Sequence, residues 1–117
     1  MAYDEALAER VRDLLTLRGD LTERKMFGGI AWMVSGNMAC GILGEDLIVR
    51  LEPDEADQAL REEHTRVFDF TGRPAKGMVM VESAAIADPA GLAGWVEAGV
   101  GFASSLPVSP RFKERGG

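Results

Sequence analysis

The feature that most restricts the fold of this chain is a stretch without a single charged side chain, residues 30–43. Within it, two apolar runs flank Gly36 and Asn37, a pair that can adopt the positive φ angles of a tight β-hairpin turn. Because uncharged strands must be shielded from water, we expect at least one face of this hairpin to be thoroughly buried. A second turn at residues 44–46 leads into residues 47–51, which are apolar except for Arg50, so the sequence predicts a three-stranded antiparallel meander.

Two longer helices are predicted at the ends of the chain. In residues 3–18, apolar side chains that include Leu14 recur at the period of one helix face. The last helix, residues 89–106, is predicted to follow the N-cap residue Asp88, with Pro89 in its first turn. Its four glycines each cost up to about 1 kcal/mol relative to alanine, so burial must compensate. Either both sides of this helix are covered within one chain, or one side faces another subunit.

The remaining predicted elements are a short helix at residues 53–63 and a further strand at residues 78–82. Together the patterns predict the α+β class: an antiparallel sheet, made of the three-stranded meander plus at least one further strand, packed by N- and C-terminal helices. We expect one domain over residues 1–106, because no linker or repeat interrupts it. Residues 107–117 are expected to form a short, disordered basic tail.

The composition narrows the classes of function. With 13 Lys and Arg against 19 Asp and Glu, the net charge is -6, which disfavours direct binding to nucleic acid. Cys40 is the only cysteine, so no disulfide can form within the chain and no cysteine-based zinc site can assemble. Neither a signal peptide nor a membrane span is evident in the sequence, and we expect a cytoplasmic protein.

One segment carries a family resemblance. It reads Arg-Lys-Met-Phe-Gly-Gly at residues 24–29, and a hairpin with Gly36 at its turn and the strand 47–51 follow it. Further along come Phe68 and Phe70, Pro74, the strand 78–81, and Asp88-Pro89 before a helix that holds Trp95. In this order the pieces resemble the N-terminal domain of the TfoX/Sxy family over nearly the whole chain, from about Tyr3 to Leu106.

The resemblance implies an α+β domain with helices packed on an antiparallel sheet. It also implies a regulatory function, because longer members of the family act as regulators of natural competence and carry a second, C-terminal domain. We expect this chain to be a single-domain member, since it ends where that second domain would begin. Arg50 stands where the family pattern usually has lysine, which keeps the positive charge and changes its shape.

Basic residues and glycines supply the candidate ligand-binding site. Arg24 and Lys25 precede Gly28 and Gly29, whose bare backbone lets an anion approach while the cations supply charge. The structural interpretation is that the two glycines allow a bulge or close packing at the start of a strand. The cations either converge on one patch for a phosphate, a carboxylate or an acidic segment, or remain solvated beside nearby carboxylates. The candidate residues are Arg24, Lys25, Gly28, Gly29, Arg50, Arg73 and Lys76.

The sequence points to no catalytic residue, no metal-ligand set and no cofactor. His64, the sole histidine, lies near Glu62 and Glu63, so an acid–base pair can be imagined there. A surface helix end, where a cation is mildly favourable, is the favoured interpretation of this histidine. Cys40 lies in the middle of an apolar strand without neighbouring positive charge, and we expect it to be a buried core residue.

Two functions from different classes are therefore open. The leading interpretation is a non-enzymatic binding or regulatory module that resembles the TfoX N-terminal domain and acts through protein–protein contacts, with a homodimer as one form of contact. The alternative is a small anionic ligand-binding protein or enzyme with a basic cleft around Arg24, Lys25 and Arg73. Direct nucleic-acid binding ranks last because of the acidic net charge.

Overall fold

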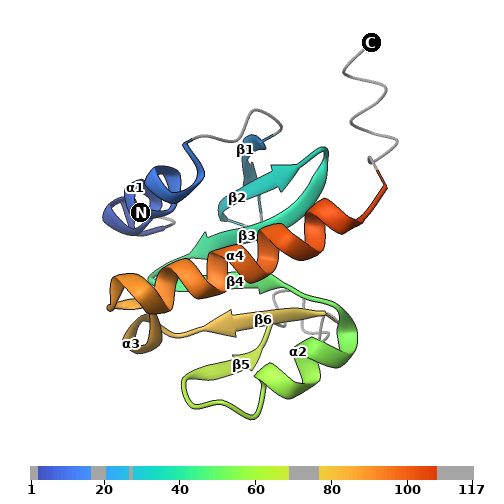
Figure 1. The fold of residues 1–117 in the computed structure, drawn as a ribbon. Helices are drawn as coiled ribbons and strands as arrows, with labels where there is room; N and C mark the ends of the chain where they lie inside the picture. Colours follow the sequence, from blue (N-terminus) through green and yellow to red (C-terminus); the bar gives the residue numbers. More distant parts are fainter. Residues whose placement is uncertain (1–2, 17–20, 27, 69–76, 108–117) are drawn as a thin grey trace.

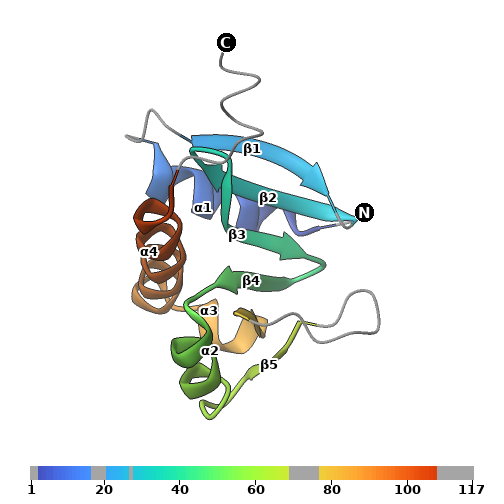
Figure 2. The same ribbon diagram turned by 90° about the vertical axis from the view of Figure 1, so that its right-hand side faces the viewer.

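The computed structural model describes residues 3–16, 21–26, 28–68 and 77–107. Its strands are β1 (Leu21–Met26), β2 (Gly29–Val34), β3 (Asn37–Leu43), β4 (Asp46–Arg50), β5 (Thr65–Val67) and β6 (Met78–Val81). Its helices are α1 (Glu5–Leu15), α2 (Pro53–Ala59), α3 (Ser83–Ile86) and α4 (Pro89–Ser105). The six strands form one antiparallel sheet in the order β1-β2-β3-β4-β6-β5, with α4 lying along one face (Figures 1 and 2). The predicted α+β class is confirmed.

The predicted meander is present as β2, β3 and β4, but its first turn lies one residue earlier than expected. Ser35 and Gly36 form the turn, with φ angles of 51° and 84°, and Asn37 already pairs with Val34. Two successive positive φ angles are what a two-residue hairpin requires, because they match the twist of the flanking strands. The hairpin also contains a shift in register after Trp32, so β3 carries one extra residue there.

A separate strand precedes the meander, where the sequence indicated at most an extension of the first strand. This strand, β1, pairs with β2 along its whole length in antiparallel register. β1 lies at the edge of the sheet, where charged side chains are tolerated and discourage pairing with other chains. The short strand β5 at the opposite edge and the short helix α3 were not predicted either.

The long helices begin where their caps place them. Asp4 accepts hydrogen bonds from the backbone of Ala6 (2.9 Å) and Leu7 (3.2 Å) at the start of α1. Asp88 accepts one from Gly91 (3.1 Å) at the start of α4, as the sequence predicted. α1 ends at Leu15, short of the predicted residue 18, and residues 17–20 lie outside the described residues. The predicted helix 53–63 stops at Ala59, because the following residues turn toward β5.

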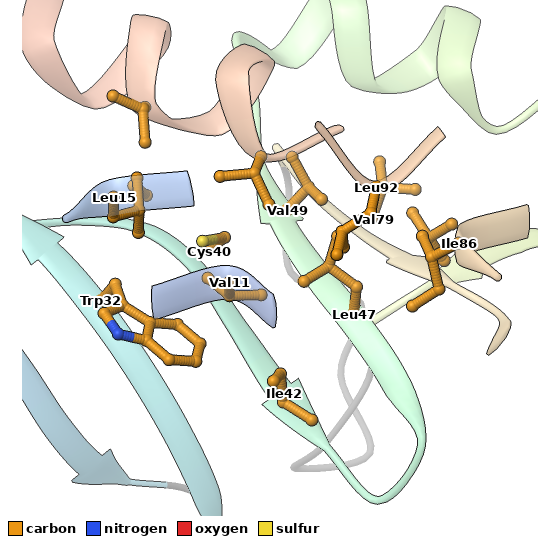
Figure 3. Close-up of a cluster of buried hydrophobic side chains, with 14 of the residues drawn as sticks. Val11, Leu15, Trp32, Cys40, Ile42, Leu47, Val49, Val79, Ile86 and Leu92 are labelled. Carbon is orange, nitrogen blue, oxygen red and sulfur yellow. The ribbon is translucent and has the colours of Figure 1, made fainter. Parts of the chain in front are cut away.

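The main core lies between the sheet and the helices α1 and α4 (Figure 3). Side chains of α1 and α4 pack there against one face of the central strands, and Ala56 and Ala59 of α2 join the same cluster. A second, smaller cluster occupies the other face of the sheet and consists of Ala31, Met38, Ile48, Phe68 and Met80. Both faces of the central strands are therefore apolar, which is why residues 30–43 carry no charge.

The structure decides how the glycine-rich helix α4 is covered. Leu92, Val96, Val100 and Ala103 are buried toward the sheet together with Gly99, whereas Gly94, Glu97, Ala98 and Gly101 are exposed. Only one side of α4 is thus covered by the described part of the chain. None of the helices in the described ranges combines the length and apolar character needed to cross a bilayer.

A single carboxylate ties α1 to the β1–β2 hairpin. Glu23 accepts two hydrogen bonds from the guanidinium of Arg12, at 2.7 and 3.0 Å, and one from the indole nitrogen of Trp32 at 3.1 Å. The hydrogen bonds from Arg12 are the main cause that lowers the pKa of Glu23 below its ordinary value, against a smaller opposing effect of burial. The group is exposed on one side, so its energetic contribution is modest.

Replacing Glu23 by glutamine is expected to lower the free energy of unfolding by about 1 kcal/mol at neutral pH. Because the pKa of Glu23 is lowered in the folded state, its contribution is complete above the unfolded value of about 4.3 and disappears as the pH falls through the folded pKa. Urea denaturation of both proteins near pH 7, 5 and 3 should therefore show a difference that shrinks at the lowest pH. Glu63→Gln, at an exposed position, serves as the control, and a pH-independent deficit in Glu23→Gln would contradict the assignment.

Candidate functional site

The first two basic residues of the predicted site point away from each other. Arg24 and Lys25 are consecutive in β1, and consecutive side chains of a strand lie on opposite faces of the sheet. Arg24 is aligned with Ala31, which belongs to the smaller cluster on the face opposite the helices. Lys25 is aligned with Ile30, whose side chain belongs to the main core beneath the helices. One ligand therefore does not meet both cations on the same face of the sheet.

Arg50 lies far from this pair. It ends β4, and two strands separate β4 from β1, which corresponds to about 14 Å at the usual spacing of neighbouring strands. Its guanidinium lies over the ring of Phe102 in α4, 5.6 Å from the ring centroid, a cation–π contact. Arg73 and Lys76 lie outside the described residues. The binding of an anion by these residues remains a prediction, and the described ones do not form a single patch.

The two glycines of the motif have structural explanations. Gly28 has a φ of 79° in the turn between β1 and β2, and a Cβ there would meet no atom within 4 Å. Its backbone conformation, rather than a lack of space, thus accounts for glycine at this position. Gly29 is buried at the first position of β2, opposite Met26.

His64 belongs to an exposed cluster of ionic side chains at the start of β5. Its Nδ1 lies 3.6 Å from a carboxylate oxygen of Glu82. Arg66 lies 3.6 Å from the other oxygen of Glu82 and donates to Asp46 at 2.8 Å. His64 itself adopts a φ of 66° in the turn after α2. The cluster links three strands of the sheet, and no nucleophile joins it among the residues that the structure describes.

Cys40 is a buried core residue, as predicted. Its side chain is among the apolar residues between the sheet and the helices (Figure 3), and burial raises the pKa of its thiol to about 12. The thiolate is the reactive form of cysteine, so this residue is inert at neutral pH. Over the described residues, no group of three or more potential ligands among His, Cys, Asp and Glu could hold a metal ion.

One apolar feature of the described surface was not predicted. A groove of about 480 Å³ runs between α1 and α4. Leu14 and Leu15 of α1 line it, together with Val96, Glu97, Val100, Gly101 and Ser104 of α4. We call it the α1–α4 groove. Its walls are largely aliphatic, and Glu97 is the one charged side chain among the described residues that line it.

The exposure of Leu14 distinguishes this groove from an ordinary seam between helices. The helical period placed Leu14 on the apolar stripe of α1, yet this residue remains 45% exposed where it lines the groove. The glycines of α4 were the one sequence feature that bore on this groove, but they left open whether both sides of the helix are covered within one chain or one side faces another subunit. The sequence alone does not show which side of the helix faces the sheet.

Comparison with known proteins identifies one family. The family model described as the TfoX N-terminal domain matches residues 13–103, a range that includes every strand of the sheet. Neither the search of curated proteins nor that of solved structures found a match.

Proposed function

The chain belongs to the TfoX N-terminal domain family, and from this premise we propose that it is a non-enzymatic binding or regulatory module that acts through contacts with another protein. The observation that supports the proposal is the α1–α4 groove, an open apolar surface with a half-exposed leucine at its edge. Exposed apolar surface beside polar residues is one feature of protein interaction sites. The module acts in the cytoplasm, where a lone thiol such as Cys40 stays reduced.

The competing function, binding of a small anion in a basic cleft, has less geometric support. Arg24 and Lys25 belong to opposite faces of the sheet, and Arg50 contacts α4 instead. A site for one small anion needs its cations to converge within hydrogen-bonding distance of the same atoms. A homodimer is a special case of the proposed protein contact, in which the partner is a second copy of the chain.

Site-specific photo-crosslinking in cells of the source organism tests the proposal. A photoreactive phenylalanine analogue at Leu14 is expected to give a discrete adduct with another protein, whereas the same analogue at Asp54, exposed on α2, should not. An adduct of twice the chain mass would identify a homodimer. The proposal fails if two results occur together. The first is that the analogue gives no adduct at Asp13, Leu14, Gly101 or Ser104. The second is that an anion raises the melting temperature of the wild-type protein but not that of the Arg24→Ala variant.

A further inference from the structure

The part of the chain that the structure describes does not explain two glycines of α4. A Cβ at Gly91 would lie 2.7 Å from the carbonyl oxygen of Ala85, and one at Gly99 would lie 2.3 Å from that of Ala39, so both sites require glycine for close packing. A Cβ at Gly94 or Gly101 would meet no atom within 4 Å, and neither residue has a positive φ. Each of these two glycines nevertheless costs up to about 1 kcal/mol of helix stability relative to alanine.

The unexplained glycines lie on one exposed side of α4, beside the α1–α4 groove. Gly94 and Gly101 are about two helical turns apart, so they belong to the same side of the helix. Ala98 between them is exposed as well, and Gly101 lines the groove itself. Along this side the helix backbone is bare enough for another backbone to approach closely, as small residues allow where helices pack tightly.

Among the residues that the structure describes, the charged side chains in and beside the groove are negative. Glu97 lies in the groove, and Asp13 is exposed next to Leu14 on α1. The arginines of α1 are engaged elsewhere: Arg10 donates to the carbonyl oxygen of Ile86 at 2.9 Å, and Arg12 binds Glu9 and Glu23. An occupant with positive charge at its flanks would therefore complement the groove, and the net charge of -6 would attract it from a distance.

From these observations we propose that the α1–α4 groove binds a cationic amphipathic α-helix of another protein. The proposal rests on the proposed function and names the chemistry of the partner. Leucine-type side chains of that helix pack against Leu14 and Val100, and its backbone approaches α4 at Gly94 and Gly101. Lysine or arginine side chains beside the apolar stripe pair with Glu97 and Asp13.

A second copy of the chain fits this surface less well than a cationic helix. In a two-fold dimer built on the groove, both subunits would present the same patch. Glu97 and Asp13 of one subunit would then face a surface with the same carboxylates, and like charges at an interface oppose association. The described residues of this face would thus oppose Glu97 and Asp13 with carboxylates, whereas a cationic helix would oppose them with positive charge.

A designed peptide tests the proposal with the full chain. The probe is a fluorescein-labelled helical peptide of about 14 residues, with leucines on one face and lysines on the other. The matched control peptide has glutamate in place of every lysine. Fluorescence anisotropy should show binding of the lysine peptide that is at least about tenfold tighter than that of the glutamate peptide. Glu97→Lys should weaken the affinity for the lysine peptide by about fivefold or more. Asp57→Lys makes the same charge change on α2 and should alter that affinity by no more than about twofold.

Steric blocking supplies an independent measurement. Gly101→Phe is expected to abolish binding of the lysine peptide without loss of helix content, because a Cβ at this position meets no atom within 4 Å. Equal weakening by Asp57→Lys and Glu97→Lys, or unchanged binding to Gly101→Phe, would overturn the proposal. A dimer in sedimentation that Gly101→Phe dissociates would also overturn it, by assigning the groove to a second copy. If Leu14 crosslinks to another protein while the lysine peptide fails to bind, the proposed function stands and only this inference falls.

Discussion

Replacing Gly99 by alanine is expected to lower the free energy of unfolding by about 2 to 3 kcal/mol, the range of an overpacked core site. The new Cβ would lie 2.3 Å from the carbonyl oxygen of Ala39, 3.1 Å from its carbonyl carbon and 3.3 Å from a methyl group of Val49. Two of these atoms belong to the backbone of Ala39, in the strand β3 that lies between β2 and β4. Alanine therefore forces α4 away from the sheet, although it is the better helix former.

Gly94→Ala and Gly101→Ala provide the matched controls on the same helix. Each should raise the free energy of unfolding by about 0.5 to 1 kcal/mol, because a Cβ at these positions has free space and alanine favours the helix. Urea denaturation and thermal melting would measure the stability of all three variants. The melting temperature of Gly99→Ala is expected to fall by roughly 10 °C. If Gly99→Ala were as stable as Gly101→Ala, α4 would lie farther from β3 than the structure places it.

Replacing Ile48 by alanine is expected to cost about 2 to 4 kcal/mol, as for a large-to-small change in a protein core. Leu47 and Ile48 are adjacent in β4 and belong to opposite faces of the sheet, yet the exposed fraction of both is 0%. Ile48 packs in the smaller cluster with Phe68 and Met80, on the face that α1 and α4 do not cover. The same substitution on a solvent-exposed sheet face would lower the free energy of unfolding much less.

The comparison of Ile48→Ala with Leu47→Ala measures how much the smaller cluster stabilises the fold. We expect similar losses from both, while Val67→Ala, at a 38% exposed position of β5, should change the free energy of unfolding by no more than about 0.5 kcal/mol. Denaturant titration of the three variants would measure these differences. A loss below about 1 kcal/mol for Ile48→Ala would show that the smaller cluster is loosely packed.

The elements predicted best are those whose signals are local. The uncharged stretch with its turn residues specified the β2–β3 hairpin to within one residue, since turn and strand preferences act between neighbours. Asp88 and Pro89 placed the start of α4 correctly because an N-cap bond spans only three residues. By contrast, β1 was not recognised as a separate strand: its sequence is highly charged, and its pairing with β2 holds it in the sheet.

The arrangement of the candidate site residues could not be predicted from the sequence. Arg24 and Lys25 are neighbours in the chain, but the alternation of a strand separates their side chains. Arg50 shares their charge, but two strands lie between β4 and β1, and its guanidinium lies over Phe102. The proximity of cations along a sequence therefore does not establish a common site. The groove beside Leu14 escaped prediction for the opposite reason, because the residues on its two walls are far apart in the chain.

By itself the sequence determined the α+β class, the central hairpin to within one residue, the N-cap of α4 and membership of the family. These follow from short-range preferences and from the order of motifs. Only the tertiary structure decided that α4 covers one side of the sheet, that Gly99 is locked against Ala39, and that Gly94 and Gly101 remain open beside the groove. The physical reason is that burial depends on which distant segments meet, and identical glycines on one helix acquire opposite roles once one of its sides packs against the sheet.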